Sequence, residues 1–98
     1  MPEVTIVYWR DIPAQVIVGK GRRGSKIQLS ERFEQAIDAA AMKLGASDTD
    51  AYLAEWRKGV PYEVEGAPAD IAASEAARLE AEYDAPRVRA LVQNEGKA

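Results

Sequence analysis

The sequence predicts an α+β fold, a small antiparallel sheet of three or four strands packed against three or four helices. Two observations carry this prediction. Residues 1–29 are rich in β-branched and aromatic residues that alternate along the chain, which is typical of strands. The remainder has apolar residues at helical spacing, separated by capping residues, glycines and prolines.

The first strand has apolar groups on both faces, which predicts an inner position in the sheet. Pro13 pushes Ile12 out of the helical region, so a tight connection leads into an antiparallel second strand. Pro61 cannot donate to a ladder, so the last strand is expected at an edge. The predicted strands span residues 3–9, 14–18, 26–29 and 60–64.

The first helix is predicted from Phe33, Ile37 and Leu44, which recur at helical spacing. They are expected to line its inner face, against the first strand or the neighbours of that strand. Ser30 is a suitable N-cap and Gly45 supplies the stop. The predicted helices span residues 31–44, 48–57, 69–83 and 86–93. The chain is expected to form a single domain over residues 1–98, with a frayed tail at 94–98.

The composition excludes several function classes. The chain has no cysteine and no histidine, so it lacks thiolate chemistry, the usual general base near neutral pH and the commonest transition-metal ligand. We therefore expect no catalytic activity, no metal and no cofactor. The sequence shows no apolar run long enough to span a membrane and no signal peptide, which predicts a cytoplasmic protein.

The charge is distributed unevenly along the chain. Residues 1–29 hold five basic residues against two acids, whereas the whole chain has a net charge of −3. Four of these basic residues lie in one glycine-punctuated segment: Lys20, Arg22, Arg23 and Lys26. Such an asymmetry suggests a polar interaction surface, although the two parts of the chain can also complement each other within the fold.

This basic segment spells G-x-G-x-x-G at Gly19, Gly21 and Gly24, but it does not open a helix directly, as a dinucleotide site requires. Three interpretations remain. The segment can be a hairpin tip with solvated charges, it can grip phosphates of a ligand or nucleic acid, or it can meet an acidic protein surface. The acidic chain, with a pI near 5.0, makes nucleic acid the less favoured partner.

A second cluster, Trp9-Arg10-Asp11, follows the first strand. Arg10 and Asp11 can pin the turn that leads to Pro13, which is the structural interpretation. In the functional interpretation, Tyr8, Trp9 and Arg10 form part of a recognition surface, because these residue types dominate interface hot spots. For the cluster itself, the structural interpretation is the preferred one.

Several segments together resemble the bacterial virulence-factor family, named after conserved virulence factor C of Gram-positive bacteria. The resemblance covers about residues 4–62 and rests on residues 8–16, 21–23, 32–33, 36–38, 40–42, 52–53 and 56–57. It implies an accessory role without defined catalytic residues, and a link to folate and corrinoid one-carbon metabolism. Larger members resemble this domain joined to helical repeats, which this chain lacks.

Taken together, the sequence predicts a non-catalytic accessory protein that binds an acidic protein partner. The predicted partner-binding residues are Trp9, Arg10, Lys20, Arg22, Arg23 and Lys26. The alternative is a phosphate-ligand or nucleic-acid binder that uses the basic glycine segment 19–26.

Overall fold

The computed structural model describes residues 2–19, 24–45 and 49–98. Its sheet is built on β1 (Glu3–Trp9), which pairs antiparallel with β2 (Ile12–Val18) on one side. β3 (Ser25–Gln28) extends the sheet beyond β2, and β4 (Trp56–Lys58) pairs with the other edge of β1. The short β5 (Tyr62–Glu63) continues along that same edge. The predicted inner strand is therefore confirmed as the centre of the sheet.

A two-residue turn and a bulge shape the β1–β2 hairpin. Arg10 and Asp11 form the turn, and the register shifts between Val7 and Tyr8, which leaves Ala14 as the extra residue of β2. Pro13 lies beside this bulge, where its missing N–H removes little from the ladder. The second strand therefore begins at Ile12, two residues before the predicted start.

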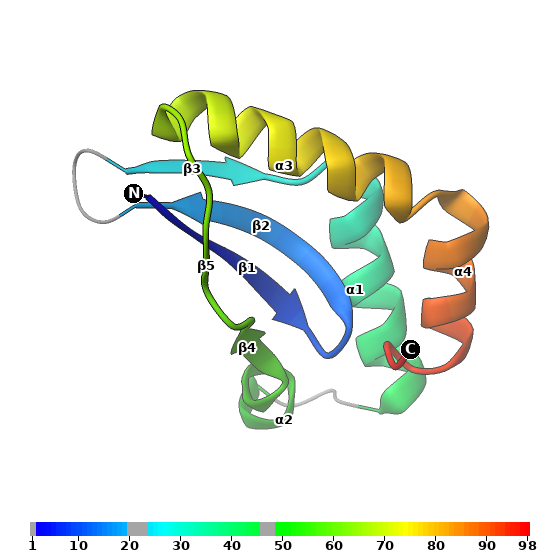
Figure 1. Ribbon diagram of the computed structural model, residues 1–98. Helices are drawn as coiled ribbons and strands as arrows, with labels where there is room; N and C mark the ends of the chain where they lie inside the picture. The colour runs from blue at the N-terminus through cyan, green and yellow to red at the C-terminus, as the bar shows by residue number, and fades with distance from the viewer. Residues whose placement is uncertain (1, 20–23, 46–48) are drawn as a thin grey trace.

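Four helices in the described residues complete the fold (Figure 1): α1 (Glu31–Leu44), α2 (Thr49–Ala54), α3 (Pro68–Glu82) and α4 (Ala85–Gln93). α3 runs along one face of the sheet, and α1 and α4 lie across the end where β1 turns into β2. Tyr62 indicates which face α3 covers. It pairs with Val4 in the sheet, and its hydroxyl donates a hydrogen bond to the Glu75 carboxylate of α3. The predicted α+β class, with an antiparallel sheet and four helices, is confirmed.

The core lies between this sheet face and the helices. Val4, Ile6 and Val16 of the sheet and Ile71 and Leu79 of α3 are all buried. Phe33 and Ile37 are also buried, as predicted from their helical spacing, and Leu44 is partly buried. α1 packs mainly against β2 and α4, so its inner face meets the neighbours of β1 more than β1 itself.

Ser30 precedes α1 but does not cap it through its side chain. Its backbone N–H and hydroxyl both donate to the carboxylate of Glu80, at 2.7 and 2.8 Å. Arg32 adds an ion pair to the same carboxylate. The residue expected to cap its own helix therefore ties the start of α1 to α3.

Two predicted elements differ from the structure. The helix predicted over 48–57 ends at Ala54, and Trp56 lies in β4, because its backbone pairs with Trp9 across the sheet. The strand predicted over 60–64 contracts to β5, and Val60 is exposed.

Candidate functional site

Trp9 does not form a contact surface. Its side chain is fully buried, its indole Nε1 donates to the backbone carbonyl of Tyr52 at 3.0 Å, and its ring centroid lies 6.0 Å from that of Tyr52. The hypothesis that Trp9 is exposed to a partner is therefore wrong. Alternation along β1 cannot reveal this, because α2 returns to cover the ring from a distant part of the sequence.

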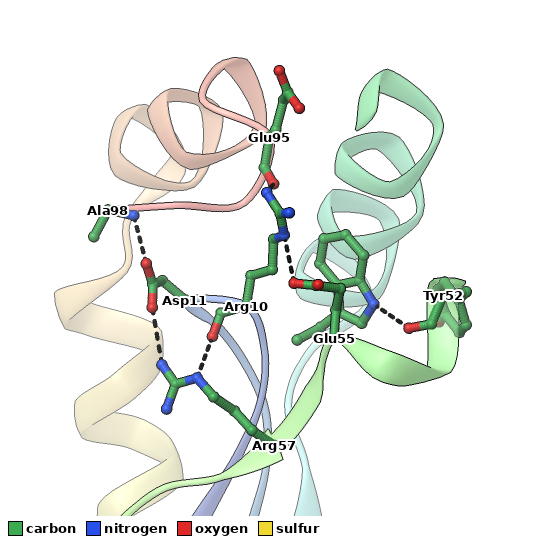
Figure 2. Close-up of polar contacts among 8 residues, drawn as sticks. Arg10, Asp11, Tyr52, Glu55, Arg57, Glu95 and Ala98 are labelled. Carbon is green, nitrogen blue, oxygen red and sulfur yellow. Dashed lines mark hydrogen bonds and ion pairs between the residues drawn. The ribbon is translucent and has the colours of Figure 1, made fainter. Parts of the chain in front are cut away.

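Arg10 and Asp11 hold the β1–β2 turn in place, as the structural interpretation predicted. Arg10 has a left-handed backbone (φ 53°), pairs with Glu55 at 2.7 Å and donates to the Glu95 carbonyl at 3.1 Å. Asp11 accepts from Arg57 at 2.9 Å, and Arg57 also donates to the Arg10 carbonyl (Figure 2). Most of the Arg10 side chain is enclosed, so it offers little surface to a partner.

The tail is docked on this turn, whereas the sequence predicts a frayed end. The Asp11 N–H donates to the Gly96 carbonyl at 2.8 Å, and the Ala98 N–H donates to the Asp11 carboxylate at 2.7 Å. Gly96 has a left-handed φ of 89°, and a Cβ there would lie 3.0 Å from the Trp9 ring. Both its backbone conformation and this close approach favour glycine, which explains how the tail reaches the turn.

Asp11 makes part of the stability dependent on pH. Its pKa lies below the ordinary value of 3.8, first because it accepts the Ala98 N–H and then because of Arg57. A lowered folded pKa adds stability above about pH 4, and this is lost as the pH falls through the folded value. Because the carboxylate is more than a third exposed, we expect less than about 1 kcal/mol.

The measurement is urea unfolding of the wild type and of Asp11→Asn at about pH 7 and about pH 3. The two proteins should differ more at the higher pH, where only the wild type carries the charge. An equal difference at both pH values would show that the Asp11 charge does not contribute.

The basic segment is only partly described by the structure. Lys20, Arg22 and Arg23 lie outside the described residues, so their predicted role stays a prediction. Lys26 is exposed on β3, close to the start of that strand. Gly19 closes the other end of the segment, and its N–H donates to the Glu3 carbonyl at 2.9 Å.

Lys26 belongs to a sheet face that the sequence analysis did not identify. Strand pairing places Ile17 between Lys26 and Thr5, and Gln15 between Gln28 and Val7. Val7 in turn pairs with Lys58 of β4. These side chains point away from the face that α3 covers, because residues alternate between faces. We call this surface the open face: Thr5, Val7, Gln15, Ile17, Lys26, Gln28 and Lys58.

The open face is accessible to a partner. Val7 and Ile17 at its centre are only partly buried, and neither is among the partly buried apolar side chains that pack against the core. Lys26 and Lys58 are exposed at its opposite edges. Sequence reasoning found apolar residues on both faces of β1 but could not tell which face the helices leave free. The one sequence signal for this face is the alternation of polar and apolar residues in β3, which indicates that one side of that strand faces solvent.

The fold and this surface define a small α+β protein that exposes one sheet face flanked by lysines. A family model described as "Virulence factor" matches residues 7–92 of the 98-residue chain. The chain belongs to the virulence factor family, as its resemblance indicated. No curated protein and no solved structure matches it.

Among the helices that the structure describes, none combines the length and apolar character that crossing a membrane requires.

Proposed function

We propose that the protein is a non-catalytic accessory protein that binds an acidic protein partner through the open face. The observation that carries this proposal is the pair of partly exposed apolar side chains, Val7 and Ile17, between two exposed lysines. Apolar contact at the centre of a patch with charge at its rim is the usual anatomy of a protein interface. The absence of histidine and cysteine from the sequence supports a role without catalysis.

Charge indicates the kind of partner. Lys26 and Lys58 flank the open face, and the sequence adds Lys20, Arg22 and Arg23 between β2 and β3. Basic residues around an apolar centre attract an acidic surface and orient it. Glu3 lies on the same face as Thr5 and Val7, and it pairs with Glu63 at the corner nearest the N-terminus, so we expect the acidic partner to bind closer to the lysines.

Nucleic acid remains the alternative partner. The lysines suit phosphates, but single-stranded nucleic acid is usually held by bases stacked on aromatic rings. Thr5, Val7 and Ile17 occupy the places where such rings would stand. This absence of aromatic residues at the centre of the face favours a protein. The link to one-carbon metabolism that the family resemblance implies stays a prediction.

The test starts from a partner recovered with the tagged protein from its native cells and then purified. Lys26→Gln with Lys58→Gln is expected to weaken binding at least about tenfold, chiefly through slower association with less salt dependence. Arg22→Gln with Arg23→Gln should weaken it in the same direction. All these substitutions should change the free energy of unfolding by no more than about 0.5 kcal/mol.

Lys43→Gln is the matched control, because Lys43 is exposed on α1, away from the open face. Full binding by the Lys26 and Lys58 double variant would contradict the proposal. Binding of generic RNA at about 0.15 M salt, with a log–log salt slope that falls by roughly two units in the double variant, would instead support nucleic acid.

A further inference from the structure

A groove separate from the centre of the open face is lined by residues of α1, α2 and β4. It encloses about 160 Å³, which is room for several water molecules. Ala14, Leu29 and Ile37 contribute apolar lining. Its other lining residues are Gln28, Glu34, Asp38, Tyr52 and Trp56.

Two aromatic rings form one side of the groove. Tyr52 and Trp56 pack edge to face, with ring centroids 6.0 Å apart and planes at 80°. Tyr52 is held by buried Trp9, whose indole donates to its backbone carbonyl and whose ring packs against its ring. Pairing with Trp9 in the sheet holds the backbone of Trp56, and the contact with Tyr52 holds its ring. The rings are therefore positioned before any ligand arrives.

Two carboxylates from α1 complete the groove. Glu34 and Asp38 are exposed and stand one helical turn apart, and their carboxylates have no hydrogen bond or ion pair with any residue that the structure describes. Like charges at this spacing destabilise a helix. Burial raises the pKa of the Tyr52 hydroxyl, and the charges of Asp38 and Glu34 raise it further. Both carboxylates are therefore close enough to Tyr52 to interact with it electrostatically.

We propose that this groove binds a small organic cation of the alkylammonium class. Ring faces attract a cation that carries apolar substituents, and carboxylates supply the opposite charge. Among the described residues, no lysine or arginine lines the groove, so none of them neutralises the carboxylates there. A bare metal ion is a poor fit, because hard cations need six or more oxygen ligands and the lining supplies aromatic surface instead.

Choline is the probe, and 3,3-dimethylbutan-1-ol, its uncharged isostere, shows whether the charge matters. We expect saturable changes in the NMR signals of the Trp56 and Tyr52 rings, with a Kd on the order of 1–10 mM. The isostere should bind at least about tenfold more weakly, because it lacks attraction to the rings and carboxylates. Glu34→Gln with Asp38→Asn should weaken choline binding by at least about tenfold.

Glu31→Gln is the matched control, an exposed acid in the first turn of the same helix that does not line the groove. Equal binding of choline and its isostere would overturn the proposal, as would unchanged affinity in the double variant or an equal loss in Glu31→Gln. Tighter binding of methylguanidinium than of choline would contradict the alkylammonium assignment. Lys26→Gln with Lys58→Gln should bind choline normally, so a failure of this proposal is distinguishable from a failure of partner binding.

Discussion

Trp9→Ala is expected to lower the free energy of unfolding by about 3–5 kcal/mol, the largest effect of any single substitution considered for this protein. The indole is fully buried, joins β1 to α2 through a 3.0 Å hydrogen bond, and packs against the Tyr52 ring. Alanine removes this packing, leaves a cavity and removes the indole hydrogen bond, so that the Tyr52 carbonyl keeps only the longer contact of 3.4 Å from the Glu55 N–H. It also removes the surface on which Gly96 of the docked tail lies.

Urea unfolding followed by circular dichroism measures this loss. Met42→Ala is the control, because Met42 is 82% exposed and its loss should change stability by no more than about 0.5 kcal/mol. A change for Trp9→Ala as small as that of the control would contradict the buried position of the indole.

The second large effect is expected for Ile37→Ala, at about 2–5 kcal/mol. Ile37 is 3% exposed and lies on the inner face of α1, which packs on β2 and α4. The alanine side chain leaves a cavity that the helix can close only partly, since the neighbouring core residues Phe33 and Ala40 are also buried.

The same unfolding experiment on Ile37→Val supplies a graded comparison, with an expected loss of about 0.5–1.5 kcal/mol. A loss for Ile37→Ala within the error of the titration would mean that this face of α1 meets solvent.

Local sequence patterns were enough to predict most of the fold. The β-branched run at residues 3–9 and the helical spacing of Phe33 and Ile37 each identify an element and its buried side. The prediction of a helix over residues 48–57 is wrong beyond Ala54, for a physical reason. Tyr52 and Trp56, four residues apart, fit one helix face, but pairing with Trp9 draws Trp56 into β4 while the two rings remain in contact. Tertiary pairing thus overrides local propensity.

The candidate site was less predictable, because it depends on which sheet face the helices leave free. Lys26 was identified from its charge, but Val7 and Ile17 look like ordinary core residues in the sequence. Lys58 was not singled out, because only strand pairing shows that it flanks the same face as Lys26. Trp9 was assigned to a surface from its residue type, whereas a helix forty residues later in the chain buries it.

Photo-crosslinking tests partner binding by the open face most directly. A crosslinking residue at Ile17 lies at the centre of this face, and one at Ala77 lies exposed on α3, on the other side of the sheet. A second variant carries the crosslinking residue at Gln15, also on the open face, in case the substitution at Ile17 itself abolishes binding. With the purified partner, we expect covalent adducts from Ile17 or Gln15, which Lys26→Gln with Lys58→Gln reduces, and none from Ala77. Adducts from Ala77 alone, or equal adducts from all positions, would contradict the assignment of the open face as the interface.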